Sequence, residues 1–232
     1  MEPFKSHRGI IATLDRANVD TDQIIPKQFL KSIKRTGFEK NLFHDWRYLS
    51  DGKPNPDFEL NDERFRNASI LVTRNNFGCG SSREHAVWAV QQYGFKAVAA
   101  PSVKRGNDAV PAFADIFRNN AAKNGLLTVE LAESEVEEIF QMTGRYKGLE
   151  ATVDLEHQRI TLHLPEEISF HFGIDSAVKE HLFHGLDEIK QTLKHEATIQ
   201  AFEAKHNAQL TVIASSALRL PRNDDNKGDR LP

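Results

Sequence analysis

Residues 69–100 read SILVTRNNFGCGSSREHAVWAVQQYGFKAVAA. The apolar run 69–73 predicts a strand, the stretch from about Ser82 to Tyr93 predicts a helix, and 96–100 predicts a second strand. Strand, helix and strand form a βαβ unit, whose crossover is right-handed. Such a unit places the end of the first strand, the glycine-rich turn and the helix N-terminus at one edge of a sheet. Open α/β sheets bind ligands at that edge, so the turn is expected to face a site.

The remaining segments continue the α/β pattern on both sides of this unit. The stretch 9–14 is short, apolar and β-branched, which predicts a buried strand, and a polar loop at 15–22 follows it. Residues 51–62 are rich in turn formers and predict a surface excursion. We further expect strands at 126–129, 152–155 and 159–164, and helices at 112–118, 134–142, 176–184, 187–193 and 197–205.

Composition and charge narrow the class of protein. Of the 232 residues, 39% are hydrophobic and 27% charged, a globular balance, and no apolar run reaches the ~20 residues that cross a bilayer. Residues 1–5 lack the apolar core of a signal peptide, which leads us to expect a cytoplasmic protein with no membrane partner. A net charge of −3 argues against nucleic acid as a partner.

The chain has one cysteine, Cys79. It therefore has no intrachain disulfide, and it cannot alone ligate an iron–sulfur cluster, which needs several thiolates. No HExxH motif occurs, and we expect this chain to hold no metal or cofactor of its own.

The turn at 76–86, Asn-Phe-Gly-Cys-Gly-Ser-Ser-Arg-Glu-His-Ala, suits a small carboxylate ligand. Gly78 and Gly80 allow positive φ and close approach of a ligand to the backbone. Ser81 and Ser82 are expected at the helix start, where free amides favour an anion, and Arg83 can grip a carboxylate with two hydrogen bonds. In the alternative interpretation, one of these serines only caps the helix.

Three other chemistries fit this turn less well. No lysine stands where a phosphate-binding P-loop requires one, and Gly-x-Ser-x-Gly is absent, which argues against a serine hydrolase. Cys79 as a nucleophile needs a base, and a helical turn points His85 elsewhere. We interpret Cys79 as a small buried filler, and Glu84 and His85 as structural hydrogen-bonding groups.

Residues 80–86 are similar to the active-site signature of the swivelling domain in the aconitase superfamily. Residues 18–30, Asn-Val-Asp-Thr-Asp-Gln-Ile-Ile-Pro-Lys-Gln-Phe-Leu, resemble the N-terminal signature of the small subunits of bacterial 3-isopropylmalate dehydratases. Further matches lie at 35–38, 42–47, 113–120, 123–127 and 185–187, so the resemblance covers about residues 8–205.

The resemblance implies an α/β fold, a three-layer swivelling β/β/α domain over residues 1–206 with C-terminal helices. Residues 207–232 are expected to form an extension with a flexible end. The implied activity is a hydro-lyase of leucine biosynthesis, which interconverts 2-isopropylmalate and 3-isopropylmalate by dehydration and rehydration. The implied partner is a large subunit that carries a 4Fe-4S cluster, and activity is expected only with both subunits.

The resemblance also implies residue roles. Ser81 would be the base, as an alkoxide, and Asp22 an active-site acid, although Asp22 as a loop cap remains an alternative. Ser82 and Arg83 would bind a substrate carboxylate, and Thr21 would also bind substrate. Arg35, in a segment that resembles a substrate-selecting loop, would contact the second carboxylate.

One segment departs from the family pattern. Residues 103–112 stand between Ser102 and Phe113, which the family joins directly. This insertion is expected at the same sheet edge as the serine turn, where it either touches the site or is inert. It leaves open a related diacid, such as citraconate, dimethylmalate or homoaconitate, and a non-catalytic anion-binding or assembly module.

Overall fold

The computed structural model describes residues 1–31, 35–106, 108–186, 188–193 and 195–217. The chain divides into two units, residues 1–187 and 188–232. The first unit holds strands β1–β9 and helices α1–α6, and the second holds α7 (Glu188–Leu193) and α8 (Glu196–Ala217). Helix α8 extends beyond the predicted end at 205, whereas the predicted tail 221–232 lies outside the described residues. The domain boundary at residue 206 stays a prediction.

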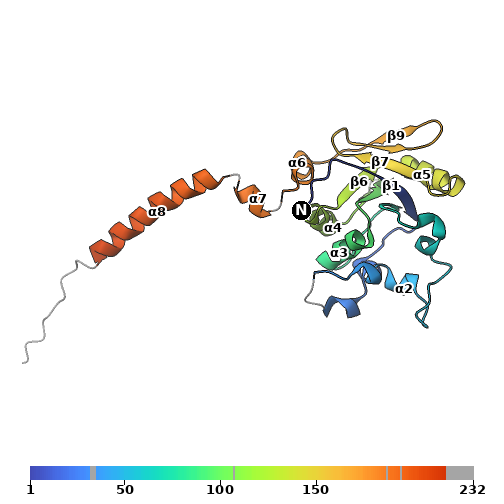
Figure 1. Cartoon of the computed structure of the whole chain (residues 1–232), viewed down its shortest axis with the longest axis horizontal. Coiled ribbons are helices and arrows are strands. Elements are labelled where there is room, and N and C mark those ends of the chain that lie inside the picture. Colours follow the sequence, from blue (N-terminus) through green and yellow to red (C-terminus); the bar gives the residue numbers. More distant parts are fainter. Residues whose placement is uncertain (32–34, 107, 187, 194, 218–232) are drawn as a thin grey trace, which may run out of the picture. The chain divides into compact units, whose positions relative to one another are not determined.

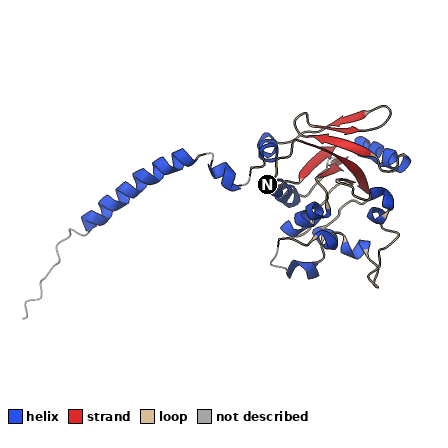
Figure 2. Cartoon of the chain, in the orientation of Figure 1, coloured by secondary structure: helices blue, strands red, loops and turns tan. Residues whose placement is uncertain are grey.

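A sheet of seven strands organises the first unit, in the order β6-β3-β2-β1-β7-β8-β9. Figure 2 shows the strands in red, with helices around them. Strands β6, β3, β2 and β1 are parallel, whereas β7, β8 and β9 continue the sheet in antiparallel pairs. The predicted βαβ unit is confirmed, with α3 (Glu84–Tyr93) joining β2 to β3. The strand bounds are β1 Ser6–Leu14, β2 Ile70–Thr73, β3 Ala97–Pro101, β6 Leu127–Leu131, β7 Glu150–Asp154, β8 Arg159–Leu162 and β9 Ile168–His171.

Strand β1 joins the parallel and antiparallel parts. Its first half pairs with β7, up to Ile10 opposite Glu150, and its second half pairs with β2 from Ile11. Gly9 lies next to this change of partner, and a Cβ there would come within 1.9 Å of the Ser69 hydroxyl oxygen. A side chain at this position would displace the Ser69 hydroxyl, which makes a hydrogen bond with His7 Nε2 at 2.7 Å.

Two hydrophobic cores lie on the two faces of the sheet. In β2, Leu71 belongs to one core, while Ile70 and Val72 belong to the other, as expected for a strand buried on both faces. Helices α3 and α4 (Asp115–Asn124) cover the first face, and α5 (Glu133–Arg145) covers the second (Figure 1). Strands β7–β9 add their apolar residues to the second core, which confirms the layered α/β fold.

The connections contain short helices and one hairpin. The α-helices are α1 Thr21–Ile24, α2 His44–Arg47 and α6 Ser176–His184, and the 3₁₀ helices are Lys27–Lys31, Glu39–Asn41, Glu59–Asn61 and Glu63–Phe65. The insertion forms a separate two-stranded sheet, β4 (Val103–Arg105) with β5 (Asp108–Val110). Strand β9 was not predicted.

Helix α4 begins later than the sequence predicted. Its first residue is Asp115 rather than Ala112. The Phe77 N–H donates to the Ala112 carbonyl at 3.0 Å, and Phe77 and Phe113 form a parallel bridge. These contacts hold 112–113 outside the helix, so tertiary pairing overrides the helical pattern.

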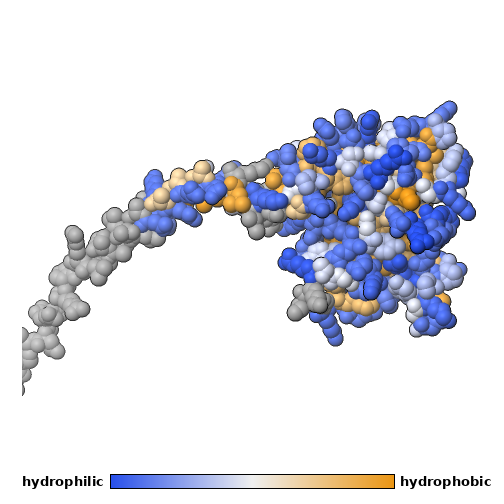
Figure 3. Space-filling view, in the orientation of Figure 1, coloured by the Kyte–Doolittle hydropathy of each residue, from blue (hydrophilic) through white to orange (hydrophobic). Residues whose placement is uncertain are grey.

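The visible face of the first unit is predominantly hydrophilic, with separate apolar residues between the polar ones (Figure 3). Exposed apolar side chains of this unit include Leu49, Ile116 and Tyr146. Among the described residues, no helix is long and apolar enough to span a membrane.

Candidate functional site

Two loops meet at the edge of the sheet where β1 and β2 end. The Gly78 N–H donates to the Val19 carbonyl at 2.8 Å, and the Thr21 N–H donates to the Cys79 carbonyl at 2.9 Å. Asp20 and Cys79 form a parallel bridge between these hydrogen bonds. The loop after β1 is thus joined to the glycine turn after β2, at the edge where the sequence predicted a site.

Both glycines of the turn adopt conformations that other residues rarely take. Gly78 has φ +76°, and a Cβ there would lie 2.3 Å from Cγ of Phe117. Gly80 has φ +88°, and a Cβ there would lie 3.3 Å from Cβ of Asp20. The predicted need for glycine is confirmed at both positions, for conformation at both and for space chiefly at Gly78.

The serines do not lie in the first turn of the helix. Helix α3 begins at Glu84, its N-cap is Arg83, and no side chain caps it. Ser81 and Ser82 are exposed residues before the helix. The predicted start near Ser82 and the alternative in which a serine caps the helix are therefore both wrong. The physical reason is Arg83, whose backbone is extended (φ −142°, ψ 108°) and whose side chain pairs with the other loop.

Asp22 and Arg83 form a bidentate ion pair. One hydrogen bond joins Arg83 Nη2 to Asp22 Oδ2 at 3.0 Å, and a second, shorter one joins Nη1 to Oδ1. The Arg83 side chain is 9% exposed and that of Asp22 is 38% exposed, and Lys27 Nζ lies 3.6 Å from Oδ2. The hydrogen bond from Arg83 lowers the pKa of Asp22, so this residue is a carboxylate at neutral pH.

The cap of helix α1 is Asp20 and not Asp22. The Asp20 side chain accepts from the Gln23 N–H at 2.8 Å, and the Gln23 side chain accepts from the Asp20 N–H at 2.9 Å. This capping box fulfils the role that the loop-cap alternative gave to Asp22. Asp22 itself is left to interact with Arg83.

Thr21 faces the protein rather than solvent. It is 3% exposed, and its hydroxyl donates to the Ser81 carbonyl at 2.8 Å. The structure brings Thr21 against the serine turn, whereas its predicted role in substrate binding stays a prediction; the burial of its hydroxyl gave no signal in the sequence.

Arg35 is tied to helix α3. Its carbonyl accepts from Gln92 Nε2 at 2.7 Å, and the Phe38 N–H donates to Gln92 Oε1 at 2.9 Å. The guanidinium of Arg35 lies 5.6 Å from the ring centre of Trp88, a cation–π contact. Sequence reasoning missed Gln92, because a glutamine on a helix is usually an ordinary surface residue. Residues 32–34 of this segment lie outside the described residues.

The other polar groups near the turn have structural partners. Burial and, second, the charge of Asp20 raise the pKa of the Cys79 thiol. His85 packs edge-on against Phe38, and Glu84 accepts a hydrogen bond from Asn124 at 3.0 Å, as expected for structural groups. Within the described ranges, no group of three histidine, cysteine or acidic residues is placed to hold a metal ion.

The insertion is rooted beside the glycine turn. The Asn76 N–H donates to the Pro111 carbonyl at 2.8 Å, while Lys104 and Arg105 are exposed on the β4–β5 hairpin. Its base therefore adjoins the turn, in agreement with the predicted sheet edge.

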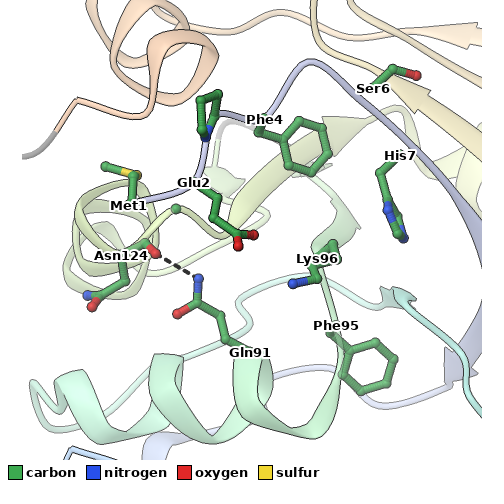
Figure 4. A pocket seen from close by; sticks show the side chains of 11 residues that line it. Met1, Glu2, Phe4, Ser6, His7, Gln91, Phe95, Lys96 and Asn124 are labelled. Atoms are coloured by element: carbon green, nitrogen blue, oxygen red, sulfur yellow. Dashed lines mark hydrogen bonds between the residues drawn. The ribbon is translucent and has the colours of Figure 1, made fainter.

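A pocket of about 320 Å³ lies at the other end of α3 (Figure 4). The N-terminal segment, including Glu2 and His7, lines it together with Gln91 and Lys96. Burial and, second, the charge of Lys96 lower the pKa of His7. None of the predicted site residues lines this pocket, so it is separate from the serine turn.

Comparisons with known proteins identify first a class of domain. The family described as the aconitase C-terminal domain matches residues 1–134. A solved structure of 3-isopropylmalate dehydratase from Methanocaldococcus jannaschii has the same fold, with a TM-score of 0.59 and 22% identity. The structural alignment covers 85% of this chain and 99% of the chain from Methanocaldococcus jannaschii.

Curated relatives then narrow the class. Proteins named 3-isopropylmalate dehydratase small subunit are 58% identical over 205 residues in Desulforapulum autotrophicum, 56% over 204 in Rhodopirellula baltica and 54% over 207 in Leptospira interrogans. The alignments cover 88% of this chain and 96%, 98% and 95% of the relatives. The chain belongs to the family of 3-isopropylmalate dehydratase small subunits.

Proposed function

We propose that this chain is one half of a two-subunit 3-isopropylmalate dehydratase. The complex interconverts 2-isopropylmalate and 3-isopropylmalate in leucine biosynthesis, and the chain acts only with its large subunit. One observation carries the proposal: in a chain 58% identical to a named small subunit, two exposed serines adjoin the Asp22–Arg83 pair. A hydroxyl base beside a guanidinium suits proton removal next to a carboxylate.

Ser81 is the proposed base. As an alkoxide it takes a proton from the carbon next to a substrate carboxylate, and that electron pair forms a double bond as the hydroxyl leaves the neighbouring carbon. Water then adds back across the double bond, so that the hydroxyl and the proton are on exchanged carbons. Arg83, Asp22 and Lys27 together carry one net positive charge, which favours the alkoxide. Ser82 and Arg83 hold one carboxylate and Arg35 the other.

Asp22 enters this proposal as a carboxylate. Because its pKa is lowered, it carries no proton to donate at neutral pH. The bidentate contact instead supports orientation of the Arg83 guanidinium. The acid role implied by the resemblance remains a prediction, and we favour the orienting role.

The proposed partner is a large subunit that holds a 4Fe-4S cluster. This chain does not fit the cluster by itself, since it offers one thiol, Cys79, whose protonated form is favoured by burial. Bound in the large subunit, the cluster would supply a Lewis acid for the departing hydroxyl. A cytoplasmic location also remains a prediction.

The first experiment is anaerobic co-expression with the cognate large subunit. The absorbance of the unsaturated product is followed with 2-isopropylmalate and with competing diacids. Activity on isopropylmalate that requires both chains supports the proposal. Activity confined to citraconate, dimethylmalate or homoaconitate would retain the mechanism and reject the substrate, and an inactive complex with an intact cluster would favour a binding module.

Substitution of the base tests the mechanism. Ser81→Ala should lower kcat by about 100- to 10,000-fold, the usual contribution of a general base, with the complex intact. Ser82→Ala is the matched neighbour, for which we expect mainly a higher KM, because Ser82 binds substrate and removes no proton. Unchanged turnover in Ser81→Ala would reject Ser81 as the base.

A further inference from the structure

Thr21 makes hydrogen bonds to the main-chain carbonyls of two residues of the glycine turn, Cys79 and Ser81. Its N–H donates to the Cys79 carbonyl at 2.9 Å, and its hydroxyl donates to the Ser81 carbonyl at 2.8 Å. In the part of the chain that the structure describes, this hydroxyl makes the only hydrogen bond to the main chain of Ser81. Thr21 is thus a two-point latch on the segment that carries the proposed base.

The local chain of Ser81 needs such a restraint. It is exposed, it follows Gly80 at φ +88°, and it precedes the helix rather than lying in its hydrogen-bonded turns. A glycine restricts the conformation of its neighbours little, and fixing a residue in one conformation costs backbone entropy. A base displaced by about 1 Å can lose on the order of 100-fold in rate.

Burial prevents the Thr21 hydroxyl from acting as a substrate ligand. Thr21 is 3% exposed, and a hydroxyl has a single proton, which the Ser81 carbonyl already accepts. Gly80 lies against the same loop: a Cβ there would lie 3.3 Å from Cβ of Asp20 and 3.7 Å from Thr21 Oγ1.

We propose that Thr21 is a positioning residue, which holds the Ser81 main chain for proton removal and does not bind substrate. The inference rests on the proposed function, because Ser81 is the base there, and it replaces the substrate-binding role predicted for Thr21.

The test uses isosteric variants and a matched control. Thr21→Val removes the hydroxyl at nearly constant volume, whereas Thr21→Ser keeps it. Thr143 is the control: it is 2% exposed, and its hydroxyl donates to the Ile139 carbonyl in α5. Thr143→Val therefore removes a similarly buried threonine hydroxyl, whose hydrogen bond lies within one helix, away from the serine turn.

Turnover is measured in the complex with the large subunit. For Thr21→Val we expect kcat to fall about 10- to 100-fold with KM within about threefold of wild type, as for lost orientation of a reacting group. Thr21→Ser should restore kcat to within about threefold, and Thr143→Val should not lower it. A raised KM at constant kcat would show substrate binding, and equal kcat in the two valine variants would show a merely structural role. Either result overturns the inference.

A second readout needs no turnover. Cys79 is the only cysteine of the chain, it is partly buried, and it lies inside the latched segment, so its alkylation rate reports local opening. Thr21→Val should raise this rate about fivefold over wild type, whereas Thr143→Val should not. Equal rates in all three proteins would overturn the latch.

These two readouts separate the two proposals. An inactive wild-type complex would reject the proposed function, while alkylation of Cys79 would still decide the latch. If Thr21→Val does not fold, Thr21→Ala removes the same hydroxyl without branching, and the same expectations apply to it.

Discussion

Substitution of Gly78 by alanine should be among the most destabilising single changes near the site. At φ +76°, a residue with a side chain costs about 1–2 kcal/mol. A Cβ would also lie 2.3 Å from Cγ and 2.4 Å from Cβ of Phe117, which is 2% exposed and buried in the first core. Forcing a methyl group into a packed core costs about 1–3 kcal/mol. We therefore expect Gly78→Ala to lower the free energy of unfolding by about 2–5 kcal/mol.

Two other glycines separate the conformational cost from the steric cost. Gly52 has φ +81°, and no atom lies within 4 Å of the place that a Cβ would occupy, so Gly52→Ala should cost only about 1–2 kcal/mol. Gly144 lies in helix α5, also with open space around such a Cβ, and Gly144→Ala should stabilise the chain by about 0.5–1 kcal/mol.

The assay is urea unfolding of the purified chain, followed by far-ultraviolet circular dichroism, with the slope of the transition compared between variants. A double-mutant cycle with Phe117→Ala tests the contact directly, since space freed at Phe117 should recover about 1–3 kcal/mol of the Gly78→Ala cost. A Gly78→Ala cost no larger than that of Gly52→Ala, with no coupling to Phe117, would refute the steric argument.

Two further predictions concern the ion pair and the tether of Arg35. Arg83 lowers the pKa of Asp22 in the folded state below its usual value of 3.8. The ion pair therefore stabilises the fold fully at pH values above 3.8, and this stabilisation is lost as the pH falls through the pKa of the folded state. The difference in unfolding free energy between wild type and Asp22→Asn, about 1 kcal/mol or less because the carboxylate is partly exposed, should shrink over that range; a difference independent of pH would contradict this. Gln92→Leu should release the Arg35 segment and reduce discrimination between isopropylmalate and other diacids about tenfold, whereas Gln91→Leu, one residue away, should not; equal discrimination in both variants would exclude the tether.

The βαβ unit was predictable because its evidence is local. Residues 69–73 and 96–100 are apolar over lengths that suit buried strands, and a helical stretch with a glycine turn separates them. The turn glycines were predictable for the same reason, since few other residues adopt positive φ. Strands β7 and β8 were predictable from two short runs, 152–155 and 159–164, with a turn between them.

Contacts between distant residues could not be predicted in the same way. The start of α3 was misplaced because serine is a good N-cap by local preference, whereas the pair of Arg83 with Asp22, 61 residues earlier, holds Arg83 extended. The hydroxyl of Thr21 and the side chain of Gln92 select backbone partners across loops. Neither choice changes the hydrophobic pattern that predicts the elements.

For the proposed diacid substrate, the charges around the Asp22–Arg83 pair provide only part of a binding site. The charge of Arg83 is already balanced by Asp22, and Lys27, 3.6 Å from the same carboxylate, is left as the nearby excess cation. Transfer of a substrate with two carboxylates from water into a protein site requires more than one compensating positive charge. Arg35 can provide one charge, and we infer that a further electrophilic group comes from the surface that closes over the serines. Ser81 and Ser82 are exposed. In the proposed complex, the large subunit would cover them, complete the site and exclude water from the reaction.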